Sequence, residues 1–165
     1  MAELTNLETK LAEVTGLAMA AQVATQKVLG IVEEDHPEYA QTLERMHDDA
    51  AETERRCTQI IDTMEGKKTA ILEEAAATKR KGADMLKIYL DADADALDGF
   101  EFLTMAEAGE VGHWKVLEAM NNNRGRSDVA GLCEWATPIQ ERHLASVTKA
   151  TRTIAAVEDP AAVAG

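Results

Sequence analysis

The sequence predicts an all-α protein, and three of its features support this fold class. The 165 residues include only three prolines and ten glycines, so few positions interrupt a helix. Aromatic residues make up 4% of the chain, whereas the helix-favouring residues Ala, Glu, Leu, Lys and Met are abundant. Apolar residues also recur at three- and four-residue spacing along most of the chain. We therefore expect amphipathic helices throughout and no β-sheet.

Length and charge limit the class of protein. A chain of this length can form one domain with a sizeable core, and we expect a single helical-bundle domain over residues 1–158 and a disordered tail over 159–165. The formal charge of −13 argues against binding to nucleic acid or to an anionic membrane surface and favours attraction of cations. No apolar run approaches the roughly 18 residues of a membrane span. The acidic, polar start MAELTNLETK is unlike a signal peptide, so we expect a cytoplasmic protein.

The first helix is expected over residues 4–32, and the second over residues 37–64. On the first, the glutamates lie well off the apolar side, while Gln22 lies nearer to it. The sequence DHPEY separates the two helices, because Pro37 suits the first position of a helix, where no backbone donor is needed.

The second helix carries two candidate metal ligands, His47 and Glu54. They lie seven residues apart on one flank of the apolar stripe, so each can face the edge of the core or water. Glu44 and His47 match the spacing Glu-x-x-His, but Glu44 points away from the stripe. For His47, a surface histidine beside an acidic helix and a metal ligand are the two alternatives.

A third amphipathic helix is expected over residues 68–90, followed by the stretch DADADALDG at 91–99. The alternating aspartates suggest a calcium loop. However, Ala96 stands where an EF-hand loop requires glycine, and Phe102 stands where it requires a bidentate acid. We therefore expect the stretch to end one helix and to supply an aspartate N-cap for the next.

The central helix, expected over residues 97–120, buries two acidic side chains. Its apolar residues form one face, with Glu107 in the middle of that face and Glu110 at its edge, one turn further on. Burying an ionised carboxylate without a partner costs several kcal/mol or forces it to take up a proton. A bound metal ion is the most economical compensation.

The last helix is expected over residues 129–157, after the loop NNNRGRSD, with Ser127 or Asp128 as its cap. His143 falls in the middle of the apolar face of this helix, and Gln140 lies beside it. Across the chain, the residues expected in the core are Phe100, Leu103, Trp114, Leu132, Ile139 and Ile154, together with Leu11, Met46 and Val147.

Glu107, Glu110, Gln140 and His143 are thus four inward polar residues on two helices. Carboxylate oxygen with imidazole nitrogen suits iron, manganese or zinc, whereas copper sites favour sulfur. A single buried Glu or His is usually a hydrogen-bonded core residue. Two helices that each place such a pair at i, i+3 favour a present or ancestral metal site.

Three stretches, ILEEAAA (71–77), AEAGEVGHW (106–114) and PIQERHLASV (138–147), resemble the ferritin-like superfamily, and within it the small stress-associated proteins of the YciF type. The resemblance implies a four-helix bundle with one long crossover between its second and third main helices, here formed by residues 67–95. Rubrerythrin-like members supply Glu-x-x-Glu from the third main helix and Glu-x-x-His from the second and fourth. The corresponding pairs are Glu107 with Glu110, Glu44 with His47, and Gln140 with His143.

The chain departs from this pattern, because the first helix offers no inward glutamate and Gln140 replaces a carboxylate. A neutral amide binds iron weakly, so the site would hold one metal or none, and enzymatic activity stays open. The resemblance implies a metal-binding protein for iron or manganese, with zinc as a further alternative, that acts in metal or oxidative stress handling as a homodimer. The alternative is a non-catalytic helical protein that acts through dimerisation, with a vestigial site. The expected metal ligands are Glu107, Glu110, His143, Gln140, His47 and Glu54.

Overall fold

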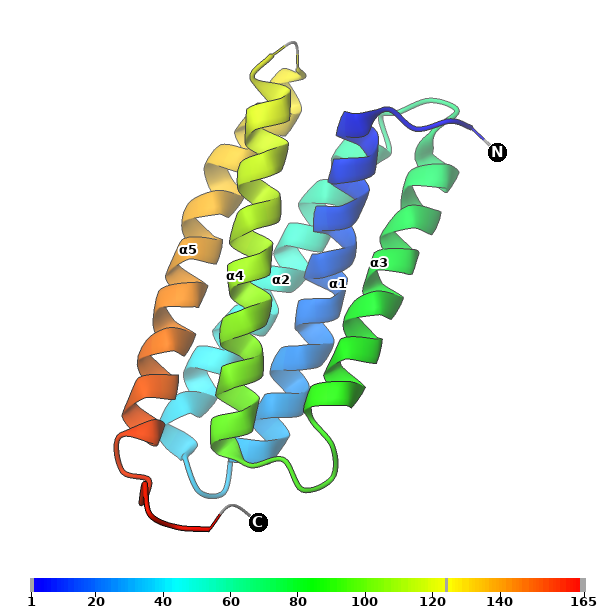
Figure 1. The fold of residues 1–165 in the computed structure, drawn as a ribbon. Coiled ribbons are helices and arrows are strands. Elements are labelled where there is room, and N and C mark those ends of the chain that lie inside the picture. The colour runs from blue at the N-terminus through cyan, green and yellow to red at the C-terminus, as the bar shows by residue number, and fades with distance from the viewer. Residues whose placement is uncertain (1, 124, 164–165) are drawn as a thin grey trace.

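The computed structural model describes residues 2–123 and 125–163 and contains five long helices (Figure 1). These helices are α1 (Asn6–Val32), α2 (Ala40–Ile61), α3 (Lys68–Tyr89), α4 (Ala96–Asn121) and α5 (Ser127–Ala155), with a short 3-10 helix, η1 (Pro37–Tyr39), before α2. No strand occurs in the described residues. The prediction of an all-α protein is therefore confirmed.

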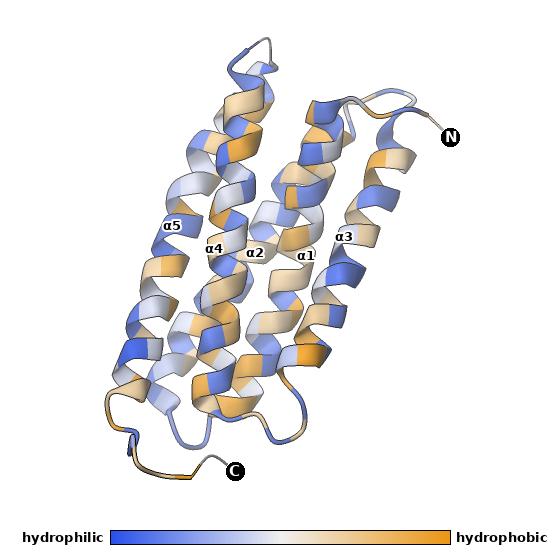
Figure 2. Cartoon of the chain, viewed as in Figure 1, coloured by the Kyte–Doolittle hydropathy of each residue, from blue (hydrophilic) through white to orange (hydrophobic). Residues whose placement is uncertain are grey.

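The helices form a bundle in which consecutive helices run in opposite directions (Figure 1). Helix α1 packs against α2, α3 and α4, and α5 packs against α4 and, less extensively, against α2. Helix α3 lies on the outer side of α1 and joins the end of α2 to the start of α4. Figure 2 shows hydrophobic and hydrophilic residues alternating along every helix, as expected where one face of a helix is buried.

Two helices begin with a reciprocal side-chain cap. At α1, the Thr5 N–H donates to the Glu8 carboxylate (2.7 Å), and the Glu8 N–H donates to Thr5 Oγ1 (3.3 Å). At α4, Asp95 and Asp98 form the same pair of bonds, both 3.0 Å long. Such a capping box satisfies backbone donors that have no partner within the helix. The expected aspartate N-cap of the central helix is confirmed.

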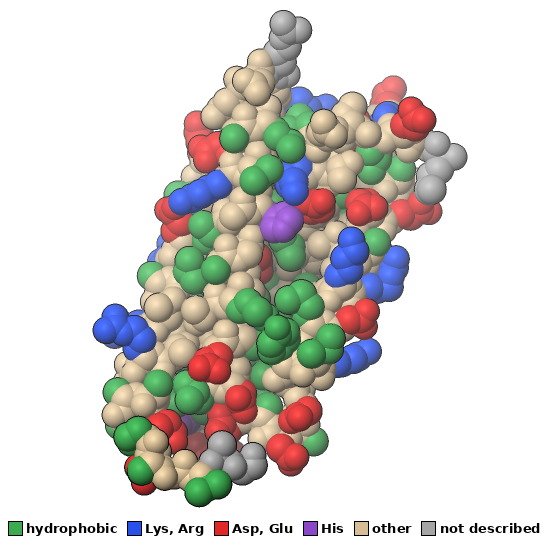
Figure 3. All heavy atoms as spheres, in the orientation of Figure 1, with side chains coloured by type: hydrophobic (Ala, Val, Ile, Leu, Met, Phe, Trp, Pro, Cys, Tyr) green, Lys and Arg blue, Asp and Glu red, His purple; other side chains and the backbone are tan. Residues whose placement is uncertain are grey.

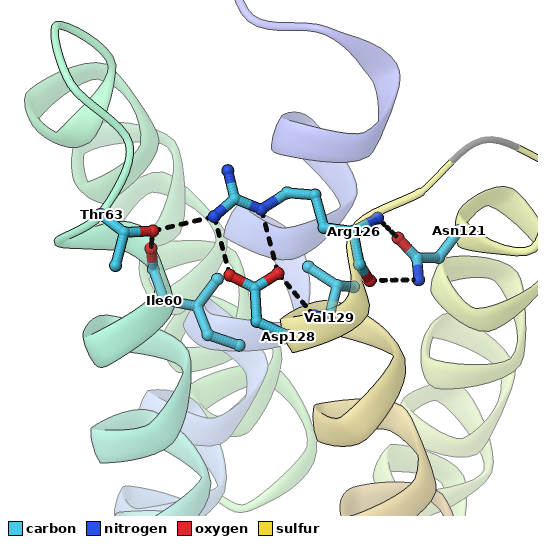
Figure 4. Close-up of polar contacts among 6 residues, drawn as sticks. All are labelled: Ile60, Thr63, Asn121, Arg126, Asp128 and Val129. Atoms are coloured by element: carbon cyan, nitrogen blue, oxygen red, sulfur yellow. Dashed lines mark hydrogen bonds and ion pairs between the residues drawn. The ribbon is translucent and has the colours of Figure 1, made fainter.

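The start of α5 differs from the prediction. The N-cap is Arg126, no side chain caps the helix, and Ser127 is already helical. The Asp128 carboxylate instead pairs with the Arg126 guanidinium (Oδ2 to Nη2, 2.7 Å) and accepts from the Val129 N–H (2.8 Å), as Figure 4 shows. Asn121 holds the turn, because its amide bonds to both the N–H and the carbonyl of Arg126. The expected cap was wrong because the helix already begins at Ser127, so that Asp128 lies in its first turn and binds both Arg126 and the Val129 N–H.

The apolar core consists of two clusters. One contains Leu11 of α1 and Trp114 of α4, and the other contains Met46 of α2 and Val147 of α5. Between them, α4 carries residues 107 and 110, and α5 carries residues 140 and 143. We call Glu107, Glu110, Gln140 and His143 the polar layer.

Eight of the nine residues expected in the core are buried. They are Leu11, Met46, Phe100, Leu103, Trp114, Leu132, Val147 and Ile154. Ile139 is only half-buried, which corrects the prediction. Gln140 takes the inward position on this turn of α5, and the neighbouring residue is therefore rotated about 100° away from it.

Two further findings concern membrane spans and the C-terminal end. No helix in residues 2–123 and 125–163 combines the length and apolar character of a membrane span.

After α5, Asp159 accepts backbone hydrogen bonds from Ala161 and Ala162, which form a turn. Of the tail expected to be disordered, residues 164–165 lie outside the described residues.

Candidate metal centre

Helices α4 and α5 place all four residues of the polar layer in the interior of the bundle. The exposed fractions are 2% for Glu107, 3% for Glu110, 2% for Gln140 and 4% for His143. Spacing of i, i+3 keeps both members of each pair on the inner side of their helix. Few polar side chains in the described residues are buried to this extent, and these four lie together on facing helices.

His143 lies between two carboxylates from different helices. Its Nε2 lies 2.8 Å from Asp49 Oδ2 on α2, and its Nδ1 lies 3.7 Å from Glu107 Oε2 on α4. Burial by itself would lower the pKa of His143, but the hydrogen bonds and attraction from Glu107 and Asp49 outweigh it and raise the pKa above its ordinary value. The arrangement therefore favours the imidazolium form.

Glu110 has no such compensation. Burial, and then repulsion from the neighbouring Glu107, raise the pKa of Glu110 well above its ordinary value, and no hydrogen bond from a described residue opposes this. Two buried acids thus share a site with one buried cation, His143. To neutralise the charge of both acids, either Glu110 must be protonated or a further positive charge must bind nearby.

Buried polar atoms without a hydrogen-bond partner concentrate around this layer. Among the described residues these atoms are Glu107 Oε2, Trp114 Nε1, Thr137 Oγ1 and Gln140 Oε1. Leaving such an atom unsatisfied costs about 1–3 kcal/mol. All four belong to α4 or α5, and two of them are oxygens of the polar layer itself. Each of those two oxygens can therefore still bind a positively charged partner.

The donor set fits a metal ion in kind. Carboxylates from Glu107, Glu110 and Asp49, the His143 imidazole and the Gln140 amide oxygen are ligands that suit iron, manganese and zinc. The side chains are not gathered around a single point, however, and no group of three or more His, Cys, Asp or Glu residues in the described ranges is arranged to hold a metal. Binding would therefore require these side chains to move closer together.

His47 and Glu54 lie apart from this arrangement. His47 Nε2 lies 3.2 Å from Gln26 Nε2, and its Nδ1 lies 3.4 Å from Asp48 Oδ1, on a partly exposed flank of α2. Glu54 Oε2 accepts a 2.5 Å hydrogen bond from Gln22 Nε2 of α1. Among the described residues, neither is hydrogen-bonded or ion-paired to the polar layer. The structure thus groups four of the six expected ligands and leaves these two outside the group.

Asp49 was not among the ligands predicted from the sequence. It lies between Met46 and Ala50, which are both buried, so its position at the edge of the apolar stripe was a usable signal. His47 lies on the opposite flank of the same apolar stripe, and a helical wheel of α2 alone does not show which of the two flanks faces α5. The structure shows that Asp49 is on the α5 side, where it also lies 3.4 Å from Arg142 Nη2.

Comparison of the chain with protein-family models, with curated proteins and with solved structures gives no match. The geometry and chemistry of the polar layer are therefore the basis for proposing a function.

Proposed function

We propose that this chain is a cytoplasmic ferritin-like protein whose polar layer binds a single divalent metal ion. Iron and manganese are the preferred ions, and zinc is the alternative. The packing of α1, α2, α4 and α5, with α3 as a crossover between α2 and α4, supports the ferritin-like part of the proposal. The observation that carries the metal-binding part is that two buried oxygens, Glu107 Oε2 and Gln140 Oε1, have no hydrogen-bond partner among the described residues.

The contacts of His143 suggest which residues would bind the metal directly and which would orient the histidine ring. Metal-bound histidines usually donate their second N–H to a carboxylate, which fixes the orientation of the ring. Asp49 holds Nε2 of His143, so Nδ1, on the side of Glu107, is the nitrogen available for the metal. Glu107, Gln140 and Glu110 would supply the oxygen ligands.

A bound divalent ion would supply the positive charge that the two buried acids lack. Glu107 and Glu110 would then both be ionised, and Gln140 Oε1 would have a partner. We propose that the protein binds metal as part of metal handling or of the response to oxidative stress. We do not propose oxidation chemistry at a two-iron site, because Gln140 stands where the two-iron pattern has a carboxylate. Storage or transfer of one ion requires only reversible binding.

Thermal unfolding with and without metal tests this function. An ion that binds only the folded protein stabilises it by about 2.7 kcal/mol at a concentration 100 times its Kd. We expect manganese, ferrous iron under anaerobic conditions, or zinc to raise the Tm of chelator-treated protein. Glu107→Gln should lose this shift, whereas Glu118→Gln, an exposed position on the same helix, should keep it. No shift with any of the three metals would refute the proposal.

The alternative function is a non-catalytic helical protein that acts as a homodimer. It is favoured by exposed apolar side chains on the outer face of α4, namely Met105 (38% exposed), Val116 (42%) and Met120 (38%). This function needs no metal. Sedimentation equilibrium of the wild type and of Val116→Lys tests it, since only a dimer that uses this face would dissociate in the variant.

A further inference from the structure

A groove lies on the face of the bundle formed by α1, α3 and α4, and its volume is about 250 Å³. Its walls include Leu17 and Ala21 of α1, Gly82 and Met85 of α3, and Met105 and Gly109 of α4. In the view of Figure 3, hydrophobic side chains gather on this face between α4 and α3. The volume is slightly below the roughly 300–1,000 Å³ of pockets for drug-sized ligands, so the groove suits a smaller molecule.

Glu110 is a buried residue that lines this groove. It is one of two polar residues that line the groove, the other being His113. His113 already has partners at the rim, because its Nδ1 lies 3.2 Å from Glu13 Oε2, and Glu13 also pairs with Lys10. Glu110 is 3% exposed and has no hydrogen-bond partner among the described residues. The groove therefore joins an apolar wall to a buried acid that lacks a counter-charge.

We propose that this groove binds a small aliphatic amine, with its chain against the apolar walls and its ammonium group paired with Glu110. Glu107 and Glu110 are two buried acids, and the neighbouring cation, His143, is already placed between Glu107 and Asp49. An ammonium group can pair with a carboxylate there, whereas a carboxylate head group would place a third acid beside Glu107 and Glu110. The net charge of −13 further favours cations over anions.

The dimensions of the groove fit a medium-length chain. Its wall on α4 extends from Phe102 to His113, about 16 Å at 1.5 Å per residue, and about 12 Å of it lies between Phe102 and Glu110. This binding goes beyond the proposed metal function and does not require it, because the groove lies on the side of α4 that faces α1 and α3, whereas His143 contacts Glu107 from α5. A metal ion that uses Glu110 would compete with the amine.

Calorimetric titration of the full chain, treated with chelator, with n-octylamine tests the inference. Octanoate and 1-octanol serve as probes with the same chain and a different head group. We expect one octylamine to bind per chain, at least tenfold more tightly than either of the other two. Absence of saturable octylamine binding, or equal or tighter binding of octanoate or octanol, would overturn the inference.

Three variants locate the binding. Glu110→Gln keeps the shape and removes the charge, so it should weaken octylamine binding at least tenfold. Gly109→Leu should block the groove, since a Cβ there meets no atom within 4 Å and the side chain can occupy the open space. Gly112→Leu also meets no atom, does not line the groove, and should bind octylamine as the wild type does.

Wild-type affinity in Gly109→Leu or in Glu110→Gln would contradict the placement, as would loss of binding in Gly112→Leu. The two leucine variants replace glycine inside a helix and should fold at least as stably as the wild type. They therefore keep the test decisive if Glu110→Gln unfolds. Metal uptake by Gly109→Leu should be unchanged, so failure of the amine proposal and failure of the metal proposal can be told apart.

Discussion

His143 is the residue that holds the charges of the polar layer together. Its imidazole meets Asp49 on one side and Glu107 on the other, so three helices contribute to one ion-paired arrangement. Removing one member of a buried pair leaves the other charge uncompensated, which is far more costly than losing a surface pair. The stability of the apo protein should therefore depend strongly on this one side chain.

His143→Gln should lower the free energy of unfolding by about 3–5 kcal/mol, because Glu107 would remain buried without its cation. Urea denaturation in the presence of a chelator measures this loss. His47→Gln is the matched control, since His47 is partly exposed on the surface of α2, and its loss should stay within about 0.5 kcal/mol. Equal effects of the two substitutions would show that the His143 ion pairs do not stabilise the fold.

Glu110 should give the protein a characteristic pH dependence. Because its pKa is raised in the folded state, the folded protein binds this proton more tightly than the unfolded chain. The resulting stabilisation is complete below the unfolded pKa, near the ordinary value of 4.5, and is lost as the pH rises through the folded pKa.

Glu110→Gln should therefore be more stable than the wild type at pH 8, by on the order of 1 kcal/mol or more, in the presence of a chelator. The difference should disappear near pH 4. Denaturant unfolding across this pH range measures it, and His143 titrates in both proteins, so the comparison isolates Glu110. A stability difference that does not change with pH would mean that Glu110 is not desolvated.

At the scale of the helices, α1 and α3 approach each other closely at two glycines. A Cβ on Gly16 would lie 2.3 Å from the carbonyl oxygen of Ala75, and a Cβ on Gly82 would lie 2.7 Å from Ala20 Cβ. The Ala75 backbone and the Ala20 Cβ are both held rigidly on their helices and cannot move aside easily, so these glycines set the distance between α1 and α3. The position of α3 against the bundle, and with it one wall of the groove, depends on them.

Gly16→Ala should destabilise the protein by about 1–3 kcal/mol, because the added methyl group overpacks the contact with α3. Gly30→Ala, on the same helix, is the control. Its Cβ meets no atom within 4 Å, and alanine is the better helix former, so it should stabilise by up to about 1 kcal/mol. Thermal unfolding compares the two, and stabilisation by both would disprove the close packing of α1 on α3.

The predicted helix boundaries lie within three residues of those in the structure. Asp95 with Asp98 is a capping pattern visible in the sequence, and α4 begins there. At α5 the expected cap was wrong, because Asp128 pairs with Arg126, and nothing in the spacing of residues shows which partner an aspartate prefers. A hydrogen bond between residues at a fixed spacing could be predicted from the sequence, whereas the choice of Asp128 between several possible partners could not.

Across the whole molecule, a polar layer separates two apolar clusters, and the sequence predicted this layer in part. Glu107 and His143 interrupt apolar stripes, so periodicity alone placed both in the interior, where the structure finds them. Asp49 was missed and Ile139 was wrongly assigned to the core, because both lie at the edge of an apolar stripe, where the neighbouring helices decide which way a side chain faces. Such neighbours are set by tertiary packing, which a helical wheel does not contain.

Both apolar clusters should contribute to one folded core. Truncating Leu11, Met46 or Val147 to alanine should cost roughly 2–5 kcal/mol each if the cavity does not collapse, since all three are at most 2% exposed. Val157→Ala, at a position that is 82% exposed, should change stability by less than about 0.5 kcal/mol. Chemical denaturation provides the values, and three losses as small as that of the control would refute the assigned core.

The central claim, that the polar layer binds one divalent metal ion, is tested most directly by metal stoichiometry. Elemental analysis should be made on protein purified without chelator and then dialysed against manganese or zinc, or against ferrous iron under anaerobic conditions. We expect about one ion per chain in the wild type and in Glu118→Gln, and almost none in Glu107→Ala, because Glu107 is the carboxylate that faces Nδ1 of His143. A metal content near zero in the wild type, or an unchanged content in Glu107→Ala, would contradict the claim.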